Sequence, residues 1–227
     1  MFIAILGRQP EISIAELEAV YGTQNVQKIP NQATTVNCDN LSIDNLGGTI
    51  KCGQVITKIK SQKSDRNTLL QASKIIVEKY TKKLSNSQKK ITLGISFYGN
   101  KIDPRNVQKI GIILKNNLKK SGVSLRLIPN KTAALSTATS HNNKLGRSEA
   151  KIEIIIAKNV YGDLIIAESR GAQNINSYTQ RDRGRPKRDA FVGMLPPKLA
   201  QIMINLSGAK PDDYLWDPFC GTGTVLQ

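Results

Sequence analysis

Short apolar runs alternate with amphipathic stretches from the first residues of the chain. "FIAIL" predicts a strand, and Ile14 and Leu17 share one face of the helix predicted to follow it. Ser13 stands three residues before Glu16, which is the spacing of a capping box. "NVQKI", "TTVNC" and "IKCGQVITKI" predict three more strands, with a short helix in "LSIDNLGG" before the last. This β-α-β-β-α-β order predicts a ferredoxin-like unit over residues 1–62.

A second α/β unit is predicted over residues 63–170. The stretch from Thr68 to Lys83 carries an apolar stripe at helical spacing, and "KKITLGISFYG" predicts a strand. Asp103 and Pro104 form an N-cap pair that opens a second helix. "VSLRLIP" predicts a strand, and "KIEIIIAK" and "DLIIAES" predict a hairpin around "NVYG". The polar, small-residue stretch "NKTAALSTATSHNNKLG" lies between them.

Residues 171–227 predict the opening of a Rossmann-like domain, so the fold class of the chain is α+β. "YTQRDRGRPKRD" is a basic linker, "MLPPKLAQIMINLSG" predicts a helix, and "DDYLWDP" predicts a buried strand. In the turn that follows, Gly221 and Gly223 let the backbone approach a ligand, which would face the free amides of a helix start. No Gly-Lys-Ser/Thr follows, and no third glycine completes a dinucleotide fingerprint.

Charge adds a binding function to this picture. The chain has 33 Lys and Arg against 17 Asp and Glu, a net charge of +16. Residues 51–150 carry 21 basic and 4 acidic side chains, whereas residues 1–50 have a net charge of −3 and residues 151–227 of +2. An excess confined to the middle segment indicates polyanion binding. A solvated lysine face is the alternative, and an anionic membrane surface is a weaker one because no helix is both strongly basic and strongly apolar on opposite faces.

Cysteine and histidine usage excludes several classes of site. Cys38, Cys52, Cys220 and His141 show no metal-ligand spacing, so we expect no metal site, no disulfide framework and no catalytic triad. No apolar run reaches the roughly 20 residues that span a bilayer. The N-terminus has no basic leader and no small-residue cleavage site. These features predict a cytoplasmic protein without a membrane partner.

Four segments together resemble one family. "DPFCGTGT" resembles motif I of the class I S-adenosylmethionine-dependent methyltransferases, in the form used by amino-group methylators of RNA and DNA. "GRPKRDAFVGMLPPKLAQIMINLSG" resembles the lead-in helix of the THUMP-domain tRNA guanosine N2-methyltransferases. "ALSTATSHNNKLG" resembles their THUMP signature, and "ILGRQPEISIAELEAVYG" resembles their ferredoxin-like start. The resemblance extends over the whole chain in order, is nearest to the type acting at tRNA guanosine ten, and implies that residues 63–170 form a THUMP-like RNA-binding domain.

The resemblance also implies roles for individual residues. The cofactor S-adenosylmethionine would contact motif I and the lead-in through Asp217, Cys220, Gly221, Gly223, Met194, Leu195 and Pro196. For the last three residues, packing at the start of a core helix is the alternative. The planar guanidinium group of arginine can donate two parallel hydrogen bonds to phosphate oxygens. The alternative for a charged linker is that its side chains are only solvated. We expect RNA contacts from basic residues of the linker and the THUMP-like segment: Arg181, Arg183, Arg185, Lys187, Arg188, Lys131, Lys144 and Arg147.

The implied reaction is methyl transfer from S-adenosylmethionine to an exocyclic guanine amine of tRNA. The 227 residues contain no "DPPY" motif, which carries the catalytic residues in this family. The sequence therefore predicts the tRNA-binding portion and the first part of the catalytic domain, truncated after motif I and inactive alone. The alternatives are a standalone tRNA-binding module and a DNA amino-methyltransferase, and the front end of the chain argues against DNA.

Overall fold

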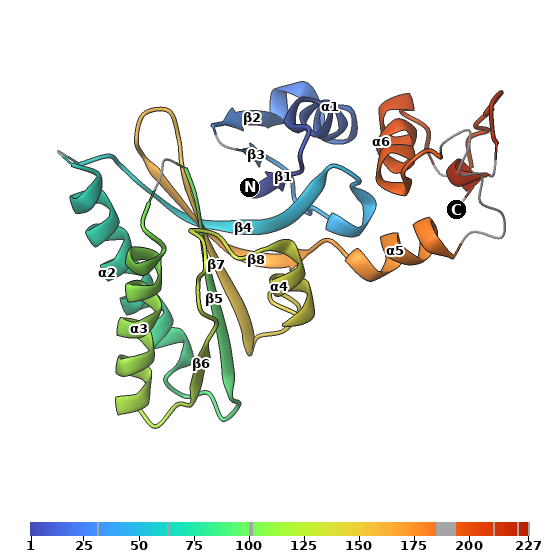
Figure 1. The fold of residues 1–227 in the computed structure, drawn as a ribbon. Helices are drawn as coiled ribbons and strands as arrows, with labels where there is room; N and C mark the ends of the chain where they lie inside the picture. The colour runs from blue at the N-terminus through green and yellow to red at the C-terminus, as the bar shows by residue number, and fades with distance from the viewer. Residues whose placement is uncertain are drawn as a thin grey trace.

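The computed structural model describes residues 1–30, 32–62, 64–99, 102–184, 194–210, 212–221 and 223–226. Figure 1 shows the arrangement of its elements, with η marking 3-10 helices. In chain order they are β1 (Phe2–Leu6), α1 (Pro10–Tyr21), η1 (Thr23–Asn25), β2 (Val26–Ile29), β3 (Ala33–Val36), η2 (Ile43–Asn45), β4 (Thr49–Ile59), α2 (Asp65–Leu84), β5 (Ile91–Tyr98), α3 (Pro104–Lys120), β6 (Leu125–Leu127), α4 (Thr137–Asn142), β7 (Lys151–Lys158), β8 (Leu164–Ala172), α5 (Ile175–Arg183), α6 (Pro197–Ser207) and η3 (Thr224–Leu226).

The strands form an eight-stranded mixed sheet in the order β2-β3-β1-β4-β8-β7-β5-β6. In the N-terminal half, β2, β3, β1 and β4 pair antiparallel with each neighbour. The long strand β4 also pairs antiparallel with β8. The sheet therefore continues from its N-terminal half, β1 to β4, into its other half, β5 to β8, which is called the middle half because it comes from the middle of the chain. The mixed α and β content is as expected, whereas the boundaries predicted at residues 62 and 170 stay predictions.

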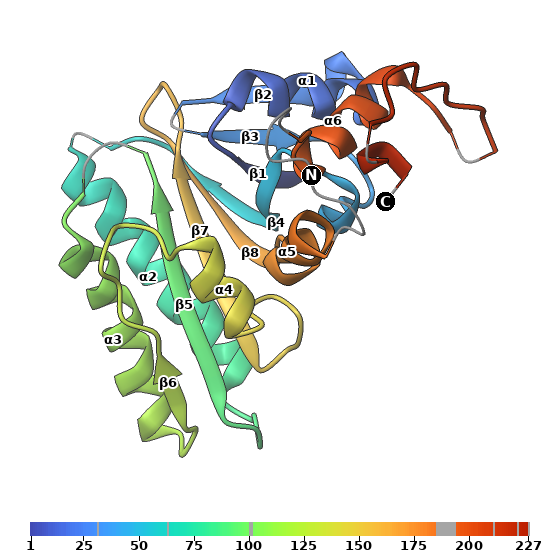
Figure 2. The same cartoon turned by 45° about the vertical axis from the view of Figure 1, so that its right-hand side comes forward.

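The middle half carries its helices on two faces of the sheet. Helices α2 and α3 lie on one face and α4 lies on the other (Figures 1 and 2). Ile154 and Ile156 of β7 belong to the core under α2 and α3, whereas Ile155 between them belongs to the core of the opposite face. The predicted cap of α3 is confirmed, because the side chain of Asp103 accepts a hydrogen bond from the Arg105 amide at 2.8 Å.

Two details of the N-terminal half differ from the sequence prediction. Helix α1 begins at Pro10, whose fixed φ suits a first turn, so Ser13 lies inside the helix and the predicted capping box is wrong. The Ser13 hydroxyl donates to the Gln9 carbonyl at 3.0 Å, and Glu16 bonds to a different segment. The predicted short helix in "LSIDNLGG" is only the 3-10 turn η2, because the carbonyls of this segment bond to distant side chains.

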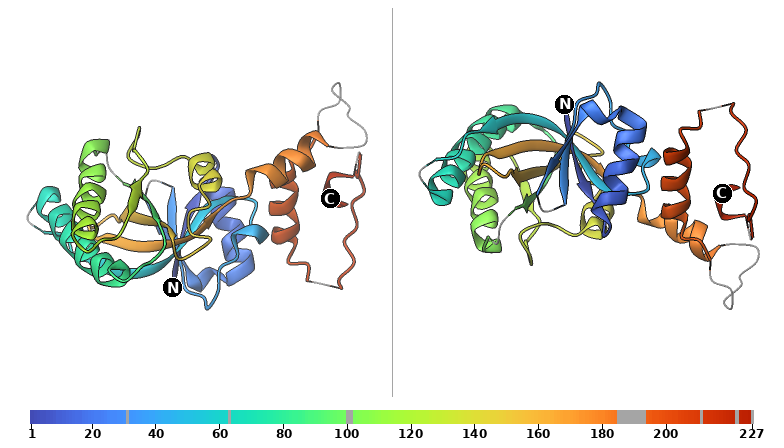
Figure 3. Two further views of the ribbon diagram at one scale, coloured as in Figure 1. Left: turned by 90° about the horizontal axis from the view of Figure 1, so that it is seen from below. Right: turned by 90° about the horizontal axis from the view of Figure 1, so that it is seen from above.

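The C-terminal region brings two further corrections. The linker predicted from "YTQRDRGRPKRD" is partly helical, since its first residues form the end of α5. The buried strand predicted in "DDYLWDP" is wrong: residues 212–218 form no strand, and Tyr214 and Trp216 are exposed. Among the described residues no strand pairs with this segment, so no ladder satisfies its backbone. Helix α6 forms as predicted and lies beside α1 (Figure 3).

Candidate nucleic-acid and cofactor interface

The predicted RNA-contact residues of the middle half lie around α4. Lys131 is exposed in the loop that leads into this helix, and Lys144 is exposed just beyond its end. The side chain of Ser136 caps α4 by accepting from the Thr139 amide at 3.1 Å. Lys144 has a φ of 53°, in the left-handed region, and its amide donates to the His141 carbonyl at 2.9 Å. The turn thus presents the Lys144 side chain at the end of α4.

Arg147 is less available than the sequence suggested. Its guanidinium forms an ion pair with Asp44 of η2, with the closest N–O distance 3.0 Å and a second contact at 3.3 Å. Both side chains are about half exposed, so the pair contributes little stability by itself. Lys144 and Arg147 line the same hollow of about 240 Å³, together with His141 and Asn174. The structure therefore brings these two predicted residues together, with Arg147 already paired.

A buried ion pair that the sequence analysis missed lies beneath α4. The Lys51 ammonium of β4 lies 2.6 Å from the Glu153 carboxylate of β7, and both side chains are fully buried. The ammonium also donates to the Leu135 carbonyl at 2.7 Å, and the Leu135 amide donates to Ser96 at 3.0 Å. Burial lowers the pKa of Lys51, and the charge of Glu153 opposes this shift. The network anchors the residue that precedes the Ser136 cap.

A signal for this network exists in the sequence. Glu153 interrupts the apolar run "KIEIIIAK" at a position inside the strand, and a charged residue there is buried only when it is paired. Its partner Lys51 lies 102 positions away, so only the fold identifies it.

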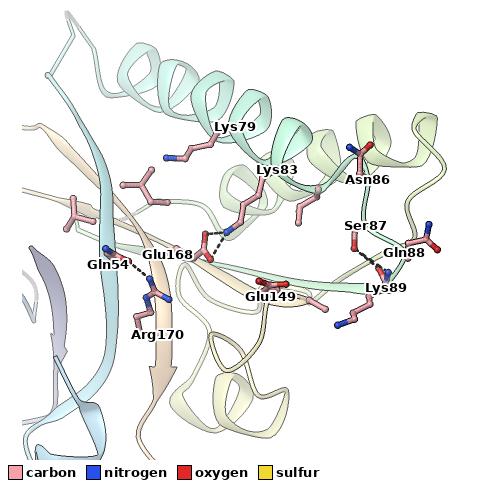
Figure 4. Close-up of a pocket in the computed structure, with 14 residues that line it drawn as sticks. Gln54, Lys79, Lys83, Asn86, Ser87, Gln88, Lys89, Glu149, Glu168 and Arg170 are labelled. Carbon is pink, nitrogen blue, oxygen red and sulfur yellow. Dashed lines mark hydrogen bonds and ion pairs between the residues drawn. The ribbon is translucent and has the colours of Figure 1, made fainter. Parts of the chain in front are cut away.

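A larger basic hollow lies between α2 and the strands β4 and β8, with a volume of about 910 Å³ (Figure 4). The Lys83 ammonium donates to the Glu168 carboxylate at 2.7 Å, and the Tyr80 hydroxyl does so at the same distance. Burial would raise the pKa of Glu168, but these hydrogen bonds outweigh it and the pKa is lowered. The charged lining is Lys79, Lys83, Lys89, Arg170, Glu149 and Glu168. The only sequence signal for this hollow was the charge excess of residues 51–150.

The linker residues within the described range lie on α5. Arg181 lies with its guanidinium carbon 5.7 Å from the ring centre of Tyr178, and the Lys198 ammonium lies 5.2 Å from the same ring. Burial lowers the pKa of Lys198. Arg183 is exposed at the end of α5. Three other predicted contacts lie outside the described residues: Arg185, Lys187 and Arg188.

The described residues of the candidate cofactor loop, 217–221 and 223, lie in tight turns. One Asp217 carboxylate oxygen accepts from the Phe219 amide at 3.0 Å, and the Cys220 carbonyl accepts from the Gly223 amide at 2.7 Å. Gly221 and Gly223 have φ values of 50° and 76°, which glycine adopts without strain. The helix expected after the loop is the single turn η3.

The lead-in residues lie at the start of α6. Pro196 occupies the N-cap position and its carbonyl accepts from the amides of Leu199 and Ala200 at 2.9 and 3.0 Å. Met194 and Leu195 are partly buried. Helix α6 contacts η3, which follows the cofactor loop directly. The structure thus brings the lead-in helix and the end of the loop into one cluster.

Comparison with known proteins agrees with these motifs. Residues 185–226 match a family model described as an RMKL-like methyltransferase domain. A curated tRNA (guanine(10)-N2)-dimethyltransferase of Methanocaldococcus jannaschii is 30% identical over 112 residues, which cover 49% of this chain and 31% of that protein. The resemblance to this family is confirmed. The protein of the same name from Methanothermobacter thermautotrophicus is 49% identical over 47 residues, covering 20% of this chain and 14% of that protein.

The matched stretches therefore span less than a third of the length of either curated relative. Among solved structures, TrmN from Thermus thermophilus aligns with a TM-score of 0.53 and 13% identity over 99% of this chain and 59% of that one. At this identity the likeness supports the fold alone. Among the described residues, no helix combines the length and apolar character needed to cross a bilayer.

Proposed function

We propose that this chain supplies the tRNA-binding surface and part of the cofactor site of a cytoplasmic S-adenosylmethionine-dependent tRNA guanosine N2-methyltransferase. The observation that carries the proposal is the methyltransferase-domain match at residues 185–226, which follows the strongly basic segment 51–150 along the chain. The names of the two curated relatives support tRNA as the substrate. The methyl acceptor would be an exocyclic guanine amine.

The proposed domain layout is a ferredoxin-like unit at residues 1–62, a THUMP-like unit at 63–170 and the start of a Rossmann-like domain at 171–227. The strand order β2-β3-β1-β4, antiparallel throughout, supports the first unit. The exposed lysines around α4 support an RNA-contact role for the second.

The candidate cofactor loop has chemistry suited to S-adenosylmethionine. The cofactor carries an ammonium and a sulfonium charge, and Asp217 offers a partly exposed carboxylate. The left-handed glycines at 221 and 223 let backbone groups approach a ligand without a side chain between them. We propose that Cys220 and the lead-in residues Met194, Leu195 and Pro196 complete this side of the site.

Gly223→Ala is expected to weaken S-adenosylmethionine binding at least tenfold, because alanine disfavours the φ that shapes the loop. Gly122→Ala is the matched control. Gly122 has the same φ of 76°, lies at the end of α3, and has nothing within 4 Å of an added Cβ. Isothermal titration with S-adenosylmethionine measures the affinities of both variants. Both substitutions are made in a form of the protein whose wild type binds the cofactor. Equal affinities of the two variants would contradict the assignment of the loop.

Replacing both Lys131 and Lys144 with glutamine is expected to weaken tRNA binding. The magnitude of the slope of log K for tRNA binding against log salt concentration should fall by about 2, because each phosphate contact releases about one counterion. Lys115→Gln with Lys119→Gln removes the same charge from the exposed side of α3, across the sheet. Filter binding over a salt series measures the slopes. The same slope in both double variants would show that only total charge matters.

A further inference from the structure

The turn at residues 44–48, called the docking turn from here on, is bound through its backbone by side chains from distant elements. The side-chain amides of Gln201 and Asn205, both in α6, donate to its first two carbonyls at 3.1 and 2.9 Å. The amide of Gln173, which follows β8, donates to the next two carbonyls at 3.2 and 2.9 Å. Four consecutive carbonyls are therefore held by the second half of the chain.

Glu16 of α1 holds the same turn through its amides. Its two carboxylate oxygens accept from the backbone N–H groups of Gly47 and Gly48, each at 2.8 Å. One of these oxygens also accepts from the Asn205 side chain at 2.7 Å. The Glu16 side chain is fully buried. One carboxylate thus joins α1, the docking turn and α6.

Gly47 is the point of closest approach between the turn and α6. A Cβ built on this residue would lie 2.2 Å from the Lys198 carbonyl oxygen and 2.9 Å from the Ile202 side chain. A backbone carbonyl inside a helix cannot move aside as the end of a side chain can. Any side chain at position 47 would therefore displace α6 from the turn.

The docking turn connects the regions assigned to RNA and to cofactor. Helix α6 lies inside the segment that matches the methyltransferase domain, and it contacts η3 behind the cofactor loop. At the other end of the docking turn, its first residue, Asp44, forms the ion pair with Arg147, which follows α4 in the chain.

We propose that the docking turn is a fixed spacer. It holds α6, and with it the cofactor loop, at one distance and orientation from the RNA-contact surface, and so determines which tRNA nucleotide receives the methyl group. The docking of α6 on this turn is argued from the hydrogen bonds and the close approach at Gly47 alone. The role in choosing a tRNA nucleotide rests on the proposed function. Glu16, Gly47 and Asn205 are positioning residues in this device.

Gly47→Ala tests the docking in the 227-residue chain by amide hydrogen exchange with mass spectrometry. Exchange in residues 197–207 is expected to accelerate at least tenfold, while β5 and β7 stay protected. Asn205→Ala removes the bonds to Glu16 and to the turn without adding bulk, and is expected to act in the same direction. Met203→Ala, a change on the exposed side of α6, is the control and should exchange as wild type.

The second arm uses protein that methylates tRNA, and maps the modified nucleotide by primer extension. In Gly47→Ala and Asn205→Ala, methylation is expected to spread to other guanosines or kcat to fall at least tenfold, with tRNA affinity within twofold of wild type. A variant that only unfolds would lose affinity as well, so the split between affinity and position separates the two explanations.

Unchanged exchange of α6 in both variants would overturn the docking. Accelerated exchange with an unchanged methylated position and unchanged kcat would overturn the spacer role. If no protein that contains these 227 residues together with a complete catalytic domain methylates a tRNA guanosine, the proposed function fails, and the exchange arm still decides whether the turn holds α6.

Discussion

Replacing Lys51 with methionine is expected to lower the free energy of unfolding by about 3–5 kcal/mol, the usual result of removing one partner of a buried ion pair. Glu153 would keep its carboxylate in a fully buried position, where Ser96 at 2.6 Å is its remaining hydrogen-bond partner among the described residues. The Leu135 carbonyl would also lose its 2.7 Å hydrogen bond. Urea denaturation followed by circular dichroism measures the loss.

The double variant Lys51→Met with Glu153→Leu is expected to recover most of this stability, because no unpaired charge stays buried. Lys60→Met is the control for the side-chain change. Lys60 pairs with Asp163 at 3.5 Å but is 91% exposed, so its loss should leave the denaturation midpoint unchanged. A Lys51→Met variant as stable as the Lys60 variant would show that the buried pair contributes nothing measurable.

A loss of order near α4 should accompany this destabilisation. In this network Lys51 binds the carbonyl of Leu135, and Ser96 binds the amide of the same residue. The residue after Leu135 is Ser136, which caps α4. The buried pair therefore positions the loop that carries Lys131 as well as stabilising the sheet. It links the strand β4 of the N-terminal half to the proposed RNA-contact surface of the middle half.

The elements that could be predicted from the sequence are those whose causes are local. The stripe of α2, the Asp103 cap of α3 and the β7–β8 hairpin are each encoded within a few neighbouring residues. The glycine turn of the cofactor loop is local too, and its left-handed φ values fit the motif. In these segments a periodicity, a cap or a turn signal was sufficient.

The interactions that could not be predicted join distant residues. Glu16 stands at capping-box spacing from Ser13, yet its hydrogen bonds reach glycines 31 and 32 positions away. Pairing of β4 with β8 merges the two predicted units into one sheet, which hydrophobic patterning within each unit cannot show. The strand expected in "DDYLWDP" failed for the same reason, because an apolar run becomes a strand only beside a neighbour that pairs with it.

Glu16→Ala is expected to lower the free energy of unfolding by about 2–4 kcal/mol, since it leaves two buried donors, the Gly47 and Gly48 amides, without an acceptor. The half-buried side chain of Asn205 would lose one of its two hydrogen bonds and keep the one to the Asn45 carbonyl. Glu11→Ala is the control on the same helix, where the side chain is 84% exposed and pairs only loosely with Lys28 at 3.6 Å. The control should unfold within about 0.5 kcal/mol of wild type.

The stability gap between wild type and Glu16→Ala is expected to depend on pH. Burial raises the pKa of Glu16 above its ordinary value of 4.5, although hydrogen bonds from Gly48, Gly47 and Asn205 oppose the shift. Between 4.5 and the raised pKa, the native state binds a proton more tightly than the unfolded chain, so wild-type stability rises as pH falls. Alanine does not titrate, and the gap should therefore widen on acidification through this window and become constant below 4.5. Denaturation midpoints from pH 7 to 4 measure it. A gap that narrows instead would show that the three hydrogen bonds outweigh burial and that the docking turn is built around the charged carboxylate.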